Sequence, residues 1–402
     1  MTSHATHPEL LVLSVNAGSS SLKLSFWQVG GSQERVVWKG AAEGLGGAES
    51  RLWLRPGDAA ASGNAGSQAI DRRQPLADVG SALSALLDLC QERGIPAPAA
   101  IGHRVVHGGP AHSAPARIDA ALLTEIRGLV SWAPLHLPAA LDAIDAVTAR
   151  FPDAAQVACF DTAFHRTLPE LAQRLPLPRE LWDRGVRRYG FHGLSYEYVV
   201  AHLGGDARGR LVIAHLGNGS SLTALRDGQP VDTSMGFTPN AGVMMGTRTG
   251  DLDPGVLVYL QASLGHDATS VARLVERQSG LLGVSGSTSD VRQLLERAPH
   301  EPHADQALRM FCYGVRKQIG AYAAVLGGLD MLVFTGGIGE RAAWVREEVC
   351  RELGYLGVAF DAEANAKHAR VITEPASRCS VRVVATDEDR MIARHTARLA
   401  QR

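Results

Sequence analysis

Two segments half a chain apart repeat one pattern, and this repeat constrains the fold more than any other feature. Residues 10–24 read LLVLSVNAGSSSLKL, and residues 210–225 read RLVIAHLGNGSSLTAL. Each reads as an apolar strand, a Gly/Ser turn and a second strand, and five positions separated by 200 residues are identical. An internal duplication of this unit predicts two similar α/β halves, each presenting one polar turn, with a cleft between them.

The composition excludes several classes of protein. The 402 residues are 45% hydrophobic and 20% charged, which is typical of a soluble globular protein long enough for two domains. Because the formal net charge is −1 and the basic residues are scattered, we expect a small-molecule substrate and neither a nucleic acid nor a membrane partner. No basic region precedes the short apolar run near the N-terminus, which predicts a cytoplasmic protein. The five cysteines form no CxxC pair, so we expect them to be reduced, without a disulfide or zinc.

The remaining chain fits alternating strands and helices. Apolar spacing predicts an amphipathic helix over 305–326, a buried strand over 331–335 and a helix over 342–353 that Gly354 ends. The stretch 46–75 is rich in Gly, Ala and Ser, and we interpret it as a surface excursion without a chemical role.

Three glycine-rich turns are candidates for binding phosphate. NAGSSSLK offers backbone N–H groups, hydroxyls and Lys23, and HLGNGSS places two glycines around Asn218, where the backbone can approach a ligand closely. A lone Gly/Ser hairpin is ordinary, and the chain has no GxxxxGK[ST] motif, but two such turns facing one cleft favour function. TGGIGERA, at 335–342, follows a strand and opens a helix, which suits a phosphate or nucleotide at the helix N-terminus.

The third turn also permits another interpretation. Residues 337–342 match GxGxxA, and Asp361 follows about 20 residues later, as in a dinucleotide-binding fingerprint. An NAD-dependent dehydrogenase is therefore an alternative function. Against it, no full set of βαβ units follows this turn, and the other two turns stay unexplained.

Histidine and arginine side chains gather in four further motifs, HRVVHGG, PLHLP, FDTAFH and RYGFHG. We expect His103, His107 and His165 to be core imidazoles, because RVV favours a strand and no HExxH motif exists. Arg248 lies in the turn-rich segment MMGTRTGDLDPG, where an anion contact is the better interpretation, and with Arg104 it would form a two-cation clamp.

Taken in order, these motifs resemble those of the acetokinase family over nearly the whole chain. The motifs that carry the resemblance are NAGSSSLK, GHRVVHGG, FDTAFH, RRYGFHGLSYEYV, HLGNGSS, MGFTPN, MMGTRTGDLDPG, TGGIGE and ATDEDRMIA. The resemblance implies an α/β fold of two duplicated ribonuclease-H-like lobes of the actin-like ATPase type, with the active site in the cleft between them. It implies an N-terminal acyl and phosphate lobe over 1–157 plus 389–402, and a nucleotide-binding lobe over 158–388.

The resemblance also implies the reaction, a reversible phosphoryl transfer from ATP to acetate that gives acetyl phosphate and ADP. It implies Mg²⁺, with Mn²⁺ as a substitute, near Asn16 and Glu388, and a homodimeric assembly. Lys23 would contact the nucleotide. The other implied nucleotide contacts are His215, Leu216, Gly217, Asn218, Gly219, Asp290, Val291, Arg292, Gly337, Ile338, Gly339 and Glu340. The implied catalytic residues are Arg104, Asp161, His192 and Arg248, and the implied acetate site adds Val106, Leu135, His136, Phe191 and Pro239.

Physical chemistry adds two refinements. Acetate is already an anion at neutral pH, so Asp161 suits orienting Arg104 or holding Mg²⁺ better than acting as a general base. Val106 in place of alanine favours acetate over propionate, although one methylene discriminates by only about 1 to 3 kcal/mol. Propionate and butyrate kinases therefore stay open as alternatives, as does a nucleotide-binding module without catalysis.

The chain departs from the family pattern at a few positions. Around the expected acyl pocket, the residues that differ from the family motifs are Leu137, Asn240 and Ala241. Beside the expected adenine pocket, Arg341 differs, and Asp389 differs directly after the expected metal ligand Glu388.

Overall fold

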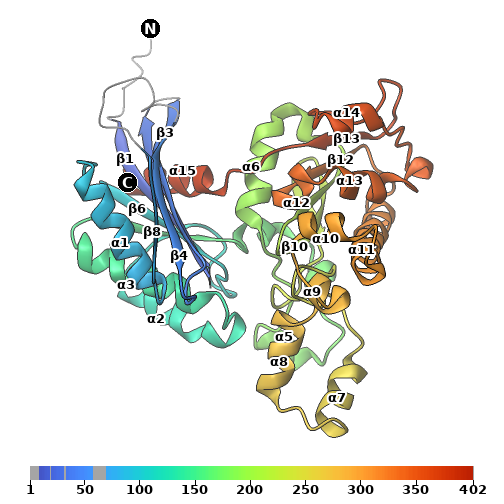
Figure 1. The fold of residues 1–402 in the computed structure, drawn as a ribbon, viewed down its shortest axis with the longest axis horizontal. Helices are drawn as coiled ribbons and strands as arrows, with labels where there is room; N and C mark the ends of the chain where they lie inside the picture. The colour runs from blue at the N-terminus through green and yellow to red at the C-terminus, as the bar shows by residue number, and fades with distance from the viewer. Residues whose placement is uncertain (1–8, 19, 31–32, 58–68, 402) are drawn as a thin grey trace. The chain divides into compact units, whose positions relative to one another are not determined.

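The computed structural model describes residues 9–18, 20–30, 33–57 and 69–401. The chain divides into two compact units: unit 1 comprises residues 1–163 and 387–402, and unit 2 comprises residues 164–386. Figure 1 shows the helices and strands of both units, most of them labelled.

Unit 1 is built on one eight-stranded sheet in the described residues, with the order β5-β4-β3-β2-β1-β6-β8-β7. The strands are β1 (Leu10–Ala17), β2 (Ser21–Gly30), β3 (Gln33–Glu43), β4 (Ser50–Pro56), β5 (Ile70–Gln74), β6 (Ala100–Val105), β7 (Ala116–Arg117) and β8 (Ala155–Phe160). The helices are α1 (Val79–Glu92), α2 (Ala120–Gly128), α3 (Leu137–Arg150) and α15 (Glu388–Ala400).

Unit 2 carries a five-stranded sheet in the described residues, with the order β11-β10-β9-β12-β13. The strands are β9 (Arg210–Leu216), β10 (Ser220–Arg226), β11 (Gln229–Thr233), β12 (Met331–Thr335) and β13 (Ser380–Val383). The helices are α4 (Glu170–Gln173), α5 (Arg179–Asp183), α6 (Gly193–Leu203), α7 (Pro254–Ala262), α8 (Ala268–Arg277), α9 (Gly280–Ser285), α10 (Val291–Arg297), α11 (Pro302–Leu326), α12 (Gly336–Arg341), α13 (Ala343–Cys350) and α14 (Ala362–Ala366).

Five strands of each sheet share one topology, which confirms the duplication predicted from the repeat. In unit 1, β1 pairs antiparallel with β2 and parallel with β6, and β6 pairs parallel with β8. In unit 2, β9 pairs antiparallel with β10 and parallel with β12, and β12 pairs parallel with β13. The repeated segments are the hairpins β1–β2 and β9–β10, so each polar turn lies at the carboxyl end of the first strand of its sheet.

Both faces of each sheet are covered, which explains why the central strands are apolar on both sides. In β1, Leu13 and Val15 pack in one cluster with α1 and α3, whereas Val12 packs with Trp27 against α15. In unit 2, the long helix α11 covers one face, and α6 packs against β9 and β12 on the other. The sheets are thereby held rigid, and their strand ends are fixed in place.

Two predictions about local structure need correction. The stretch 46–75 is more than a surface excursion, because β4 and β5 extend the sheet of unit 1 and bury Leu52, Leu54 and Ile70; its residues 58–68 lie outside the described chain. The helix expected to reach residue 353 ends at Cys350, because a turn places Leu353 in the core, so Gly354 does not cap it. The predictions for 305–326 and 331–335 are confirmed by α11 and β12.

All five cysteines are free and buried. Among the described residues, no helix is both long and apolar enough to cross a membrane.

Candidate active site

An arginine and two carboxylates meet at the carboxyl edge of the unit 1 sheet. Arg104 lies near the end of β6, and its Nε and Nη2 donate to Asp161 Oδ2 at 2.9 and 2.6 Å. Its Nη1 donates to Asn16 Oδ1 at 3.2 Å and lies 3.6 Å from Glu388 Oε2. Asn16 Nδ2 donates to Glu388 Oε2 at 3.3 Å, which closes the group. We call Asn16, Arg104, Asp161 and Glu388 the arginine–carboxylate cluster.

The topology of the sheet explains why these four residues meet. Asn16 and Arg104 lie on the parallel strands β1 and β6, Asp161 directly follows the parallel strand β8, and Glu388 begins α15, which packs on the same strands. Because the carboxyl ends of parallel strands lie at one edge, residues far apart in sequence converge there.

Burial dominates the electrostatics of this cluster. The Asp161 side chain is 1% exposed, and burial raises the pKa of its carboxyl group to about 6, although the Arg104 guanidinium opposes the shift. The nearby carboxylates raise the pKa of Arg104 in turn, so the guanidinium stays charged. Asp161 Oδ1 is buried and has no hydrogen-bond partner among the described residues. An unpartnered carboxylate oxygen in such a place calls for a further partner, such as a water molecule or an ion.

The cluster fits a magnesium ion that is shared with substrate. No group of three or more His, Cys, Asp or Glu residues in the described chain could hold a metal alone. Mg²⁺, however, is usually bound by one or two carboxylates together with substrate phosphates and water. Asn16, Glu388 and the unpartnered Asp161 Oδ1 supply oxygen atoms of this kind.

Lys23 and three residues of the expected acyl pocket also belong to unit 1. Lys23 is exposed on β2, directly opposite Asn16 in the β1–β2 pairing. Val106 is buried one residue beyond β6, and Leu135 and His136 are half-buried ahead of α3. Leu137, one of the departures, is fully buried in the core under α2 and α3. It is therefore a packing residue.

A second group surrounds His192 in unit 2. His192 caps α6 in a left-handed conformation (φ 58°), and its Nδ1 lies 2.8 Å from Ser221 Oγ. Tyr196 OH lies 2.5 Å from the same Oγ. The His192 ring stacks on His215 with centroids 4.2 Å apart, and Ser195 Oγ is 2.8 Å from His215 Nδ1.

These contacts assign the proton on His192. Tyr196 is fully buried, burial raises the pKa of its hydroxyl, and Ser221 is its hydrogen-bond partner in the described chain. Tyr196 therefore donates to Ser221, because its proton would otherwise be buried without an acceptor. The Ser221 hydroxyl then donates to His192 Nδ1, which leaves the ring proton on Nε2.

His192 Nε2 and Arg248 converge on the HLGNG turn. A Cβ atom added at Gly219 would lie 3.3 Å from His192 Nε2 and 3.6 Å from Arg248 Nη1. Arg248 Nη1 also donates to the Pro239 carbonyl at 2.8 Å, which orients the guanidinium. The buried Phe191 precedes His192, and Pro239 is buried as well. Two hydrogen-bond donors and an open glycine thus meet at one place in unit 2.

The TGGIGE turn follows β12 and forms α12. Gly336 has φ 76°, and a Cβ there would lie 2.7 Å from the Leu216 carbonyl, so only glycine fits. Glu340 Oε1 accepts from the amides of Gly336 at 3.1 Å and Thr386 at 3.0 Å. The Glu340 side chain therefore shapes the turn through its backbone.

The segment 290–292 begins α10. Asp290 caps the helix by accepting from the Arg292 amide at 2.8 Å, and Val291 packs in the core against which Ile338 also lies. The structure thus brings 290–292 and the TGGIGE turn to one apolar cluster.

The comparisons with known proteins agree with this geometry. The model of the Acetokinase family matches residues 11–394. This chain belongs to the acetokinase family. An acetate kinase of Rhodopseudomonas palustris (strain TIE-1) is 43% identical, with 97% of this chain and 98% of that protein covered. A propionate kinase of Citrobacter rodentium (strain ICC168) is 41% identical, with 97% of this chain and 96% of that protein covered.

Solved structures of the family share the fold of this chain. The crystal structure of Porphyromonas gingivalis acetate kinase superposes with a TM-score of 0.84 at 36% identity, covering 97% of this chain and 99% of that one. The crystal structure of a propionate kinase from Francisella tularensis superposes with a TM-score of 0.89 at 34% identity, covering 97% of this chain and 99% of that one. The fold is therefore the duplicated α/β fold of actin-like ATPases that this family has.

The dehydrogenase interpretation of the GxGxxA turn is wrong. A dinucleotide-binding domain requires an open, mostly parallel sheet, whereas β9, β10 and β11 are antiparallel neighbours here. Asp361, the expected ribose ligand, caps α14 by accepting from the Ala364 amide at 2.9 Å.

Tyr196 and Ser221 were not among the site residues predicted from the sequence. One signal for them was available, because Tyr196 lies four residues after His192 on the helix and Ser221 is the repeat counterpart of Ser21. His103, His107 and His165 are buried, as expected, and His103 and His165 bond through Nε2 to Gln156 and to the Phe191 carbonyl.

Proposed function

We propose that this protein is an acetate kinase, which transfers the γ-phosphoryl group of ATP to acetate and catalyses the reverse reaction. The observation that carries the proposal is the convergence of His192 Nε2 and Arg248 Nη1 on the open backbone of Gly219. A phosphoryl group in transfer is multiply anionic, and preorganised donors of this kind stabilise it.

The reaction proceeds by direct in-line transfer. A carboxylate oxygen of acetate attacks the γ-phosphorus, the bond from phosphorus to the bridging oxygen breaks, and ADP leaves with that oxygen. His192 donates through Nε2–H, and Arg248 through its guanidinium, to phosphoryl oxygens. Acetate gives up no proton, so no general base is required.

Arg104 and Asp161 help to bind acetate, which accepts the phosphoryl group. Arg104 binds the acetate carboxylate or a phosphoryl oxygen, and Asp161 holds the guanidinium through two hydrogen bonds to one oxygen. Asp161 is therefore a positioning residue for Arg104 and, through Oδ1, a potential partner of the metal.

Asn16 and Glu388 would hold Mg²⁺, or Mn²⁺ in its place. The bound ion neutralises charge on the phosphate oxygens. Asn16 is oriented for this role because it bonds both Arg104 and Glu388.

We assign ATP to unit 2, with the HLGNG turn at the phosphates and residues 290–292 and 337–340 at the adenosine. We assign Arg104, Val106, Leu135 and His136, which all belong to unit 1, to acetate. The support is that the HLGNG and TGGIGE turns follow the parallel strands β9 and β12 of unit 2, and that Arg104 lies near the end of β6 in unit 1. Acetate is preferred over propionate because the buried Val106 would restrict a small apolar pocket.

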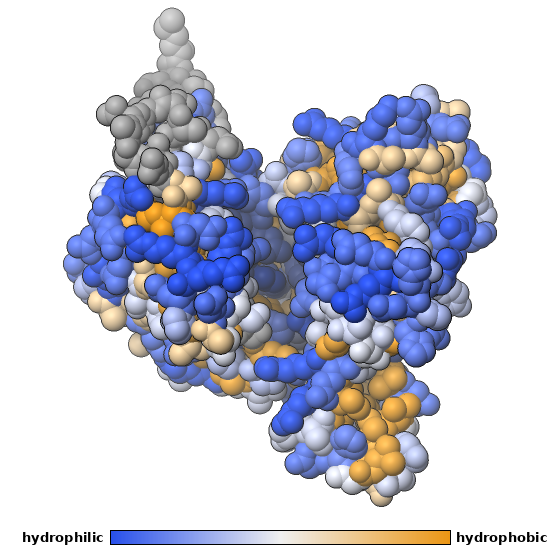
Figure 2. Space-filling view, in the orientation of Figure 1, coloured by the Kyte–Doolittle hydropathy of each residue, from blue (hydrophilic) through white to orange (hydrophobic). Residues whose placement is uncertain are grey.

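We propose that the enzyme works in the cytoplasm as a homodimer. The five buried thiols suit a reducing compartment that supplies ATP. A second copy would cover the apolar surface on and around α7, which forms the orange patch at the lower end of unit 2 (Figure 2). Its exposed side chains are Leu252, Val256, Val258, Tyr259 and Leu264.

Trapping of the product with hydroxylamine tests the proposed activity. Protein supplied with ATP, Mg²⁺, acetate and hydroxylamine should form acetyl hydroxamate, and less hydroxamate should form from propionate. Failure to form a hydroxamate from acetate, propionate or butyrate would reject an acyl kinase.

A further inference from the structure

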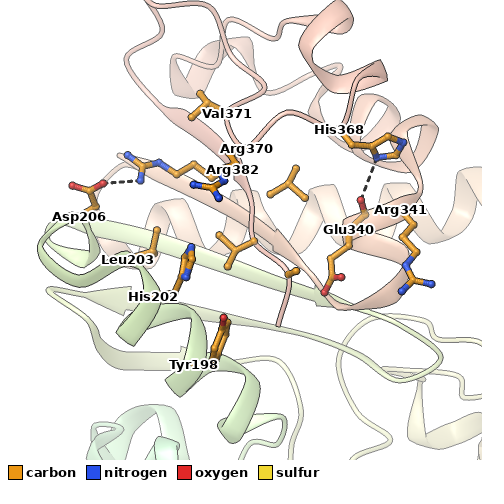
Figure 3. A pocket seen from close by; sticks show the side chains of 13 residues that line it. Tyr198, His202, Leu203, Asp206, Glu340, Arg341, His368, Arg370, Val371 and Arg382 are labelled. Atoms are coloured by element: carbon orange, nitrogen blue, oxygen red, sulfur yellow. Dashed lines mark hydrogen bonds and ion pairs between the residues drawn. The ribbon is translucent and has the colours of Figure 1, made fainter. Parts of the chain in front are cut away.

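A cavity of about 820 Å³ lies wholly within unit 2, beside the TGGIGE turn. Figure 3 shows its walls, which come from α6, from the end of α12, from β13 and from the segment 368–371. None of the residues to which we assign acetate or the metal lines it. Among the residues assigned to the nucleotide, Glu340 alone lines the cavity, so the rest of its wall has no role in the proposed reaction.

The cavity concentrates positive charge. Arg341, Arg370 and Arg382 line it together with His202 and His368, and its acidic residues are Asp206 and Glu340. Both acids are engaged: Asp206 Oδ2 lies 2.7 Å from Arg382 Nη1, and Glu340 Oε1 accepts from two backbone amides. Within the described chain, Arg341 and Arg370 form no ion pair. The cavity thus offers guanidinium groups that no protein carboxylate neutralises.

Two of the arginines are held next to each other by the backbone. Val371 and Arg382 form an antiparallel bridge, and the Val383 amide donates to the Arg370 carbonyl at 2.9 Å. Arg382 Nε is buried and has no hydrogen-bond partner among the described residues. Arg370 forms no ion pair in the described chain, so an anion bound at this wall would gain a charge-assisted hydrogen bond from it.

The opposite wall is apolar and aromatic. The Tyr198 and His202 rings stack with centroids 5.9 Å apart, and Leu203 and Val384 complete that side. Figure 3 shows Tyr198, His202 and Leu203 lying across from Arg370 and Arg382. A ligand that contacts both walls would carry an anionic group at one end and a carbon skeleton at the other.

We propose that this cavity is a second ligand site, which binds a small organic phosphate. Arg370 and Arg382 hold the phosphate, because guanidinium groups donate paired hydrogen bonds to its oxygens. The carbon skeleton lies against Tyr198, His202 and Leu203. Glu340 lines the same cavity and holds the amides of Gly336 and Thr386, so a bound ligand contacts the side chain that shapes the TGGIGE turn.

Calorimetric titration with glucose 6-phosphate tests the site. The titration uses the full-length protein with saturating ADP and Mg²⁺, so that a nucleotide site is already filled. We expect saturable binding of glucose 6-phosphate and none of glucose. Arg370→Ala should weaken binding by about tenfold or more, since it removes charge-assisted hydrogen bonds. The matched variant Arg273→Ala removes an exposed arginine of α8, outside the cavity, and should bind as the wild type does.

Three results would overturn the proposal: no saturable binding of either glucose 6-phosphate or inorganic phosphate, equal affinity in Arg370→Ala and wild type, or binding abolished by ADP. Thermal unfolding of each variant verifies that it is folded. Because binding is measured directly, the result is independent of kinase activity, and a protein that failed the hydroxamate test could still pass this one.

Discussion

His192 Nδ1 lies 2.8 Å from Ser221 Oγ, and this contact fixes which nitrogen of the proposed catalytic histidine carries the proton. Ser221 Oγ accepts a hydrogen bond from the buried Tyr196 hydroxyl, and the Ser221 hydroxyl donates one to His192 Nδ1. His192 therefore presents Nε2–H beside Gly219 and Arg248, where the transferring phosphoryl group would lie.

Ser221→Ala should lower kcat about ten- to a hundredfold with little change in KM for ATP, because the ring loses the bond that fixes its tautomer and orientation. Steady-state kinetics measures both constants. Ser14→Ala is the matched control, since Ser14 is an equally buried serine in the sheet of unit 1 and its hydroxyl donates to the Ser25 carbonyl. An unchanged kcat in Ser221→Ala would show that His192 needs no such support.

Val106→Ala should raise the ratio of kcat/KM for propionate over acetate about tenfold, because removing methyl groups enlarges the proposed acyl pocket. Val105→Ala makes the same chemical change one residue earlier, where the side chain is buried in the core under α2 and α3. It should reduce thermal stability and leave the ratio unaltered. If both variants kept the wild-type ratio, Val106 would not form the pocket.

Glu388→Gln should raise the Mg²⁺ concentration needed for half-maximal activity by about tenfold, since it replaces a charged oxygen ligand by a neutral one. The measurement is a Mg²⁺ titration at fixed ATP and acetate. Glu347→Gln, on the exposed side of α13, serves as the control. A Mg²⁺ dependence that is the same in both variants would remove Glu388 from the metal site.

His165 should make the protein less stable in mild acid. Its Nε2–H donates to the Phe191 carbonyl at 3.0 Å, and burial lowers the pKa of the ring to about 4, whereas the ring in the unfolded chain has a pKa near 6.5. Between these values the unfolded chain binds a proton that the folded protein does not, so stability is lost as pH falls from about 6.5 toward about 4.

The expected loss for His165 between pH 7 and pH 5 is about 2 kcal/mol in the free energy of unfolding. Urea unfolding at the two pH values measures it. The His165→Gln variant should lose less free energy of unfolding between the two pH values. His303 is exposed, so His303→Gln should lose as much as the wild type does. A pH dependence equal in all three proteins would mean that His165 takes up its proton in the folded state.

The fold was easiest to predict where a polar turn is flanked by strands with periodic apolar residues. The repeat at residues 10–24 and 210–225 predicted the duplicated sheets, since a strand–turn–strand pattern is local and its apolar residues are periodic. The stretch 46–75 was misinterpreted because its Gly and Ser content hides two short strands, which exist only through pairing with β3 and with each other. Tertiary pairing of this kind leaves little trace in local composition.

For the candidate site, the individual residues could be predicted from the sequence, but the hydrogen bonds between them could not. Arg104, Asp161 and Glu388 could be named individually from their motifs, but their hydrogen bonds arise only when three strand ends and α15 meet. The proton on His192 depends on Tyr196 and Ser221, which lie 25 residues apart in the chain. Long-range contacts fix such details, and a linear pattern does not contain them.

The most direct test of the central claim follows ³¹P resonances in a mixture of ATP, Mg²⁺ and acetate with the wild-type protein and with Arg248→Ala. The wild type should convert the ATP signals to those of ADP and acetyl phosphate. Arg248→Ala should do so at least about a thousandfold more slowly, by analogy with the loss of an arginine that stabilises a transferring phosphoryl group. No acetyl phosphate from the wild type, or an equal rate in the variant, would contradict the account.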